Sequence, residues 1–129
     1  MKKLLVVDDE PDFVELVAFN LRHEGFEVLT ATNGWEAIEL ARSDLPDLIL
    51  LDLMLPDFDG FAVCEMLRLR SSTAAIPIIL LTAWISDESR RLGLELGAND
   101  YVTKPFSPRE LMQRVNRVLE RSEAIAPHI

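Results

Sequence analysis

The sequence predicts an α/β domain in which helices cover both faces of a parallel β-sheet. Short apolar runs alternate five times with segments of helical periodicity, a pattern typical of parallel strands joined by right-handed crossovers. One run, Leu48–Leu51, is apolar without interruption, as in a strand buried on both faces. Polar residues follow these runs directly. Asp52 is one of them, and it falls at the sheet edge where open α/β folds bind their ligands.

The first half of the chain predicts three strands joined by two helices. Pro11 suits the first turn of the first helix, and Gly25 ends it. Asn33 and Gly34 open the second helix, whose inward-facing residues are Ala37, Ile38 and Ala41. Pro46 ends the connection that follows this helix. The predicted strands are Lys3–Val7, Phe26–Ala31 and Leu48–Leu51.

The second half of the chain predicts two further strands and three helices. The predicted strands are Ile76–Leu81 and Tyr101–Thr103, and the helices are about Asp59–Leu69, Ser86–Leu96 and Ser107–Arg121. The middle helix of these three carries Leu92 and Leu96 inward but little else that is apolar. We therefore expect it to be the least firmly packed helix. Ser107 and Glu110 frame a capping box, with Pro108 in the first turn, and mark a sharp start of the last helix.

Composition narrows the class of protein. A length of 129 residues and a hydrophobic content of 49% suit one folded domain. The net charge of −9 argues against binding of nucleic acid by this domain, because phosphates would repel it. No apolar run is long enough for a membrane span or a secretory signal, so a cytoplasmic protein is predicted. Cys64, the single cysteine, is interpreted as a core residue rather than a nucleophile.

Polar residues at the predicted strand ends form the candidate site. Asp8 and Asp9 follow the first strand, Asp52 the third, Thr82 the fourth and Lys104 the fifth. Parallel strands share their carboxyl edge, so these side chains should lie close together. Three carboxylates at one place repel one another unless a cation lies among them. Oxygen ligands alone favour a hard ion such as Mg²⁺, with Mn²⁺ as an alternative. Solvated acids at loop starts would explain any pair of these residues, but they explain all three less well.

A lysine, a hydroxyl and a metal beside one carboxylate can hold a tetrahedral dianion on that carboxylate. Asp52 is therefore the candidate nucleophile, which would form an aspartyl-phosphate. Lys104 would neutralise a phosphoryl oxygen, and Thr82 would donate a hydrogen bond to it. Taken alone, Asp52 is better explained by the capping of a turn, and only the other strand-end residues favour the nucleophile.

Four segments together resemble the receiver domain of bacterial two-component response regulators. They are Val7–Glu10, Asp52–Gly60, Thr82–Ala83 and Tyr101–Phe106. The resemblance implies a single flavodoxin-like domain of five strands and five helices over residues 1–121, with strand order 2-1-3-4-5. Residues 122–129 are expected to form a frayed tail. The implied partner is a sensor histidine kinase or a phosphotransfer protein, which would phosphorylate Asp52.

The resemblance also assigns individual residues. Mg²⁺ would be held by Asp9, Asp52 and the backbone carbonyl of Met54, with Asp8 acting mainly through water. The peptide bond between Lys104 and Pro105 is implied to be cis. On residue type alone, Tyr101 is more often a packing residue than a switch. In the family, however, the threonine that corresponds to Thr82 moves toward the phosphoryl group and the aromatic swings inward, reshaping the fourth helix and fifth strand.

Residues 93–101 and 104–111 are similar to receivers of the winged-helix transcription-factor class. These receivers pair through the fourth helix, fifth strand and fifth helix, so a homodimer through this face is implied. Asn99 and Asn116 stand where that class usually carries an acid and a lysine, which removes two expected cross-interface charges. Sequence leaves open whether the chain is a stand-alone receiver or part of a longer regulator.

Two other functions fit parts of the pattern. A phosphohydrolase of the haloacid-dehalogenase type also phosphorylates an aspartate, but it needs an acid where this chain has Met54. A flavin-binding module needs a phosphate loop rich in glycine and hydroxyl groups, whereas Asp8, Asp9 and Glu10 would repel a phosphate. A switch that catalyses only its own phosphorylation and slow dephosphorylation is therefore favoured over an enzyme.

Overall fold

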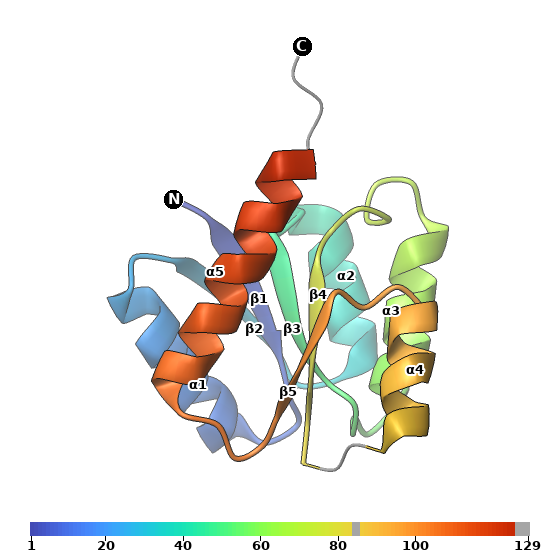
Figure 1. Ribbon diagram of the computed structural model, residues 1–129, viewed down its shortest axis with the longest axis horizontal. Helices are drawn as coiled ribbons and strands as arrows, with labels where there is room; N and C mark the ends of the chain where they lie inside the picture. Colours follow the sequence, from blue (N-terminus) through green and yellow to red (C-terminus); the bar gives the residue numbers. More distant parts are fainter. Residues whose placement is uncertain (84–85, 126–129) are drawn as a thin grey trace.

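The computed structural model describes residues 1–83 and 86–125, and it confirms the predicted α/β fold (Figure 1). Within this part of the chain, five strands form one parallel sheet in the order β2-β1-β3-β4-β5, as the resemblance implied. The strands are β1 (Lys3–Val7), β2 (Glu27–Ala31), β3 (Leu48–Asp52), β4 (Ile78–Thr82) and β5 (Asp100–Thr103).

Helices cover both faces of the sheet (Figure 1). Helices α1 and α5 pack on one face, while α2 and α3 pack on the other with α4 beside them. The helices are α1 (Pro11–His23), α2 (Gly34–Asp44), α3 (Gly60–Leu69), α4 (Asp87–Glu95) and α5 (Pro108–Ile125).

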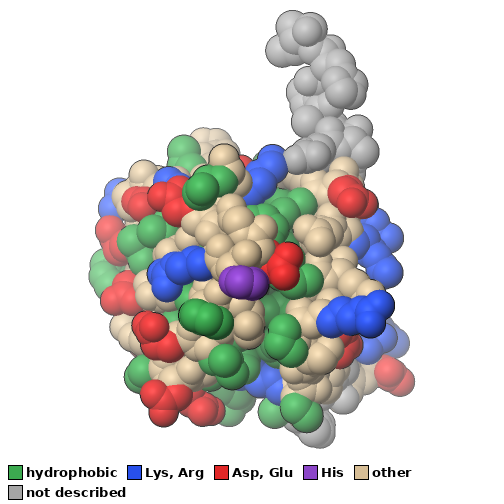
Figure 2. Space-filling view, turned by 90° about the vertical axis from the view of Figure 1, so that its left-hand side faces the viewer, with side chains coloured by type: hydrophobic (Ala, Val, Ile, Leu, Met, Phe, Trp, Pro, Cys, Tyr) green, Lys and Arg blue, Asp and Glu red, His purple; other side chains and the backbone are tan. Residues whose placement is uncertain are grey.

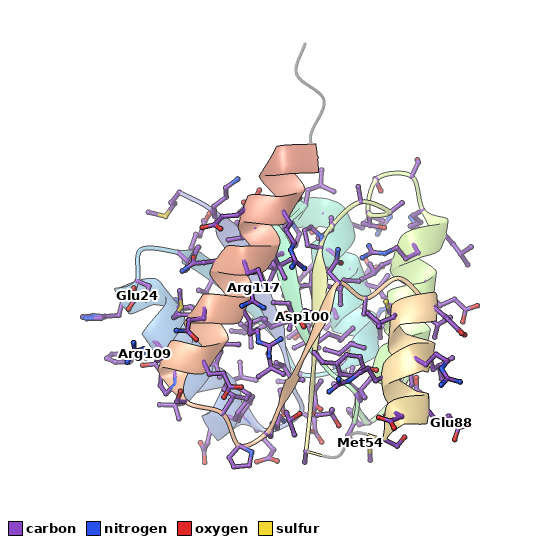
Figure 3. All side chains as sticks on the ribbon, in the orientation of Figure 1. Glu24, Met54, Glu88, Asp100, Arg109 and Arg117 are labelled. Atoms are coloured by element: carbon purple, nitrogen blue, oxygen red, sulfur yellow. The ribbon has the colours of Figure 1, made fainter. Side chains whose placement is uncertain are left out.

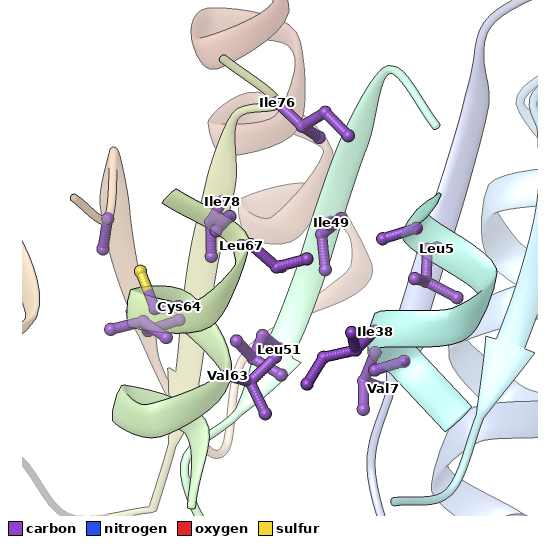
Figure 4. Packing of buried hydrophobic residues seen from close by; sticks show 14 of the residues in the cluster. Leu5, Val7, Ile38, Ile49, Leu51, Val63, Cys64, Leu67, Ile76 and Ile78 are labelled. Carbon is purple, nitrogen blue, oxygen red and sulfur yellow. The ribbon is translucent and has the colours of Figure 1, made fainter. Parts of the chain in front are cut away.

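Each central strand divides its side chains between two hydrophobic clusters. In β3, Ile49 and Leu51 pack beneath α2 and α3, whereas Leu48 and Leu50 pack beneath α1 and α5. Figure 4 shows the first of these clusters, in which Cys64 lies among aliphatic side chains. Cys64 is fully buried and burial raises the pKa of its thiol, so its interpretation as a core residue is confirmed. The uninterrupted apolar runs are explained by helices on both faces.

Several element boundaries differ from the predictions, among them those of β4, β2 and α5. Strand β4 begins at Ile78 rather than Ile76, because Ile76 belongs to a turn in which its N–H donates to the Thr73 carbonyl. Strand β2 begins one residue late, at Glu27. Helix α5 continues to Ile125 instead of ending near Arg121. The frayed tail predicted for residues 122–129 stays a prediction, and residues 126–129 lie outside the described chain.

Helix α4 packs thinly, as the sequence predicted. Gly93 is its one buried residue, because the Tyr101 side chain lies directly beneath it. A Cβ atom at Gly93 would come within 2.5 Å of the Tyr101 hydroxyl oxygen, so a larger residue would push the helix outward. The prediction that Leu92 faces inward is wrong, since 41% of it is exposed. Leu96, which caps the helix, does pack against the core.

The outer surface mixes apolar and charged groups. Figure 2 shows the side on which α1 lies, where hydrophobic side chains stand among acidic and basic ones. Leu16 and Phe19 of α1 are 60% and 67% exposed. No helix in residues 1–83 and 86–125 is both long enough and apolar enough to cross a membrane.

Arg68 of α3 forms hydrogen bonds to two loops at once. Within residues 1–83 and 86–125, it has no carboxylate partner. Its guanidinium donates to the carbonyls of Ile76 and Gly97, each over 2.7 Å, and to the side-chain oxygen of Asn99 over 3.2 Å. Asn99 also accepts the Ile78 N–H over 2.9 Å. Burial lowers the pKa of Arg68, a sign that the cation is partly removed from water. The cluster connects α3 to the loops that enter β4 and β5.

Replacing Arg68 with methionine should destabilise the domain. The apolar stem would be kept, but buried carbonyls would lose a charged donor, at a cost of about 2–3 kcal/mol. Chemical denaturation would measure the free energy of unfolding. Arg70→Met, at an exposed position just after α3, is the control and should change stability little. Equal stability of Arg68→Met and wild type would contradict the role given to the cluster.

Candidate functional site

The sheet brings the predicted polar residues together at the carboxyl ends of its strands. Asp52 and Thr82 are the last residues of β3 and β4, while Asp8 and Lys104 directly follow β1 and β5. Asp8, Asp52 and Thr82 are all buried, and Asp9 is exposed. The predicted convergence is therefore confirmed, because parallel strands present their ends at one edge.

Lys104 lies between two of the carboxylates. Its ammonium nitrogen is 2.6 Å from Asp8 Oδ2 and 3.5 Å from Asp52 Oδ2. Burial alone would lower the pKa of Lys104, but the hydrogen bond and charge of Asp8, together with Asp52, outweigh it and raise that pKa. Lys104 is thus held as a cation beside Asp52, where it can neutralise negative charge that is added to the site.

The surroundings of Asp52 oppose its ionisation. Its pKa is raised to about 6, first because burial penalises the carboxylate and second because Asp8 carries the same charge. Lys104 and the Met54 N–H, which donates to Asp52 Oδ1 over 3.3 Å, act in the opposite direction. Further positive charge near Asp52 would therefore favour its ionised form.

The acidic cluster fits a hard divalent cation. One carboxylate oxygen from each of Asp8, Asp9 and Asp52 lies within 4.8 Å of the others. Ligands of this kind suit Mg²⁺ or Mn²⁺ in oxygen coordination. Met54, whose backbone carbonyl is a further predicted ligand, lies at the same edge of the sheet, with its side chain 74% exposed (Figure 3).

The loop after β3 is held in place by Asp57, a residue that the sequence analysis did not select. Its carboxylate accepts the N–H groups of Gly34 and Trp35, at 2.7 and 2.9 Å, from the first turn of α2. Gly60 lets α3 begin close to β3, since a Cβ atom there would lie 2.6 Å from the Asp52 carbonyl oxygen. These contacts position the loop that carries Met54.

Tyr101 points inward in this structure. It is 6% exposed, its hydroxyl donates to the Ser89 carbonyl of α4, and the Arg90 guanidinium lies 5.9 Å from its ring centroid. Burial raises the pKa of the phenol, although Arg90 opposes this. The ring thereby connects β5 to the thinly packed helix. Its inward position is the one that the resemblance associates with a phosphorylated site.

The loop after β5 adds two features around Lys104. The Lys104–Pro105 peptide bond is cis, as predicted. Phe13 of α1 places its ring 4.3 Å from the Lys104 ammonium, and Phe106 meets that ring edge-on. Phe13 was not expected at the site, because nothing local in the sequence connects it to a lysine so far along the chain.

Comparison with known proteins identifies the family. The model of the response regulator receiver domain matches residues 4–116. This chain belongs to the response regulator receiver family. A curated relative, the alkaline phosphatase synthesis transcriptional regulatory protein PhoP of Bacillus subtilis (strain 168), is 52% identical over 126 residues, 98% of this receiver. The receiver spans about half (52%) of the length of PhoP.

Solved structures of receivers agree with this fold. The chemotaxis protein CheY4 of Vibrio cholerae is 35% identical, with a TM-score of 0.88, over 92% of this receiver and 98% of that chain. The receiver domain of the sensor histidine kinase PA1611 from Pseudomonas aeruginosa PAO1 is 32% identical, with a TM-score of 0.85, over 92% and 98% of the two chains. The PA1611 structure has a magnesium ion coordinated in its active-site cleft.

The raised pKa of Asp52 predicts a pH-dependent stability in the absence of divalent cations. Between the ordinary pKa of 3.8 and the folded-state value of about 6, the folded receiver keeps a proton that the unfolded chain has released. The contribution of Asp52 to the free energy of unfolding therefore decreases as the pH rises through this window. In EDTA, Asp52→Asn should gain melting temperature relative to wild type between about pH 4 and pH 7.

Glu120→Gln, an exposed change toward the far end of α5, is the control and should follow wild type at every pH. Melting curves recorded across the pH range would measure all three proteins. A constant difference between Asp52→Asn and wild type would show that the pKa of Asp52 is not raised.

Proposed function

We propose that this receiver is a phosphorylation-activated switch in which Asp52 accepts a phosphoryl group from a sensor histidine kinase or a phosphotransfer protein. The observation that carries the proposal is the Lys104 ammonium between buried Asp8 and Asp52, with Asp9 beside them. Such a group of charges is costly in a folded protein and has an evident use in phosphoryl transfer. Membership of the receiver family supports the same function.

In the proposed reaction, a carboxylate oxygen of Asp52 attacks the phosphorus atom of a phosphohistidine. The new phosphorus–oxygen bond forms as the phosphorus–nitrogen bond breaks, and the electron pair leaves with the imidazole nitrogen. Lys104 then exchanges part of its contact with the carboxylates for a phosphoryl oxygen. Mg²⁺, which Asp9, Asp52 and the Met54 carbonyl would hold with Asp8 acting mainly through water, supplies positive charge to the phosphoryl oxygens when bound.

The receiver itself is proposed to turn over no external substrate. Met54 occupies the place where a phosphohydrolase of the haloacid-dehalogenase type needs a general acid. Its thioether can neither donate nor remove a proton at the reaction centre. Loss of the phosphoryl group should therefore be limited to slow autodephosphorylation.

The output is proposed to be a change in the face formed by α4, β5 and α5. Thr82 ends β4, and its hydroxyl would donate to the phosphoryl group, while Tyr101 contacts α4 from β5. A shallow hollow on this face is lined by Arg90, Leu94 and Arg114, among other residues. Because α4 buries only Gly93, small changes behind it can shift its position.

Pairing of two receivers through this face remains part of the proposal, with fewer charges than the winged-helix class usually provides. Asn99 accepts a hydrogen bond from Arg68 within the chain, and Asn116 is exposed and uncharged. Asp100, which Figure 3 shows between β5 and α5, pairs within the chain with Arg114 over 3.0 Å. A regulator of transcription in the cytoplasm is the proposed setting, by analogy with PhoP. The net charge of −9 makes DNA binding by the receiver itself unfavourable.

Asp52→Asn should abolish phosphorylation. Incubation of wild type with acetyl phosphate and Mg²⁺ should add about 80 Da, the mass of one phosphoryl group, and EDTA should prevent the addition. Intact mass spectrometry would follow the adduct, which should be stable in acid and labile in base. Persistence of the adduct on Asp52→Asn would refute the assignment of the phosphoacceptor.

Thr82→Ala should separate phosphorylation from output. The aspartate would still accept a phosphoryl group, but the hydroxyl that links it to the distant face would be missing. Hydrogen exchange with and without beryllofluoride, a phosphoryl mimic, would compare residues 87–104 in both proteins. We expect protection to change in wild type and to stay constant in Thr82→Ala. Equal changes in the two proteins would exclude a route through Thr82 while leaving the role of Asp52 untouched.

A further inference from the structure

Two carboxylates and one aromatic ring lie close to the Lys104 ammonium. Asp8 Oδ2 lies at 2.6 Å, Asp52 Oδ2 at 3.5 Å, and the centroid of the Phe13 ring at 4.3 Å. An ammonium attracts the negative face of an aromatic ring at such distances, and more strongly where water is excluded. The lysine side chain is 19% exposed, so little water competes with the ring.

We infer that Phe13 is a positioning residue for Lys104, holding the ammonium beside Asp52 by a cation–π contact during phosphoryl transfer. The inference rests on the proposed function, because it concerns the same aspartate. Phe13 makes no bond to the phosphoryl group. It acts by keeping the cation where a phosphoryl oxygen will arrive.

The position of the ring is itself built into the fold. Phe106, two residues after Lys104, meets Phe13 edge-on with centroids 5.9 Å apart and planes at 77°. This T-shaped geometry directs the edge of one ring at the face of the other and is a favourable arrangement for aromatic pairs. Phe13, Lys104, Pro105 and Phe106 also line a common hollow on the surface beside the site. Helix α1 and the loop after β5 thus both contribute to the surroundings of the lysine.

The physical consequence concerns the moment at which Asp52 is phosphorylated. The carboxylate oxygen that forms the new bond loses its negative charge, so its attraction for Lys104 weakens. Asp8 and the phosphoryl oxygens would then compete for the ammonium, and Asp8 would draw it toward β1. The ring attracts the cation independently of the ionisation of either acid, because its quadrupole does not titrate. Phe13 should therefore matter for the rate of phosphorylation more than for the stability of the fold.

Site-specific fluorination of Phe13 tests the inference with almost no change of shape. Fluorine atoms withdraw electron density and progressively weaken the negative potential of the ring face. The reaction is transfer from acetyl phosphate to Asp52, in which acetate leaves with the electron pair of the broken phosphorus–oxygen bond. With Mg²⁺ present, the rate constant should fall stepwise from phenylalanine to its 4-fluoro, 3,5-difluoro and 3,4,5-trifluoro forms. The total loss should be about three- to tenfold, the size of one cation–π contact.

Two sets of variants separate electrostatics from packing. Phe13→Tyr should keep the rate near that of wild type, whereas Phe13→Leu should be slowed as much as the trifluoro form. Phe19, 67% exposed on the same helix, is the control position, and its trifluoro form should react like wild type. Melting temperatures of the fluorinated proteins should agree with wild type, which excludes unfolding as the cause of slower transfer.

The experiment distinguishes failure of this inference from failure of the proposed function. If wild type forms no adduct, the phosphoacceptor assignment is wrong and the inference fails with it. If wild type reacts but all fluorinated forms react equally fast, Phe13 contributes only packing and the inference alone is overturned. A slowing that is equal at Phe13 and at Phe19 would also overturn it.

Discussion

The ion cluster of Asp8, Lys104 and Asp52 is the constraint on which the rest of the site depends. Two buried carboxylates meet at one sheet edge, where burial first and the charge of Asp8 second raise the pKa of Asp52 to about 6. Lys104 offsets much of the repulsion because it contacts both acids. Removing Lys104 would leave two buried carboxylates without a compensating cation. The cluster therefore favours an added cation over the isolated receiver.

The fold supplies this cluster through the connectivity of its sheet. Asp8 and Lys104 are 96 residues apart, and they meet because β1 and β5 end at the same edge. Secondary contacts then refine the geometry: Asp57 secures the loop after β3 to α2, and Phe13 covers Lys104 from α1. A rigid core beneath the site and a loosely attached α4 beside it are complementary features. The first holds the reacting groups, and the second can respond to them.

The sequence predicted the fold and the meeting of the strand-end residues well, for an identifiable reason. Helices on both faces of a parallel sheet require uninterrupted apolar strands, and such runs are visible in Leu48–Leu51 and its counterparts. Once the strands are known, parallel pairing places their carboxyl ends together, and Asp8, Asp52, Thr82 and Lys104 follow. The errors concern where helices and strands begin or end, and which apolar side chains are exposed. Ile76 is apolar but lies in a turn, and Leu92 is apolar but 41% exposed.

Sequence by itself determined the class of fold, the cluster of strand-end residues and the resemblance to receivers, because each follows from local residue order or from motif spacing. Only the tertiary structure decided that Phe13 covers Lys104, that Arg68 joins two loops through carbonyls, and that Tyr101 lies inward beneath Gly93. Each of these contacts joins segments whose distance in space depends on how the helices pack on the sheet. An aromatic or an arginine in an amphipathic helix has the same local pattern whether it packs, binds or faces solvent, so its partner appears only once the chain is folded.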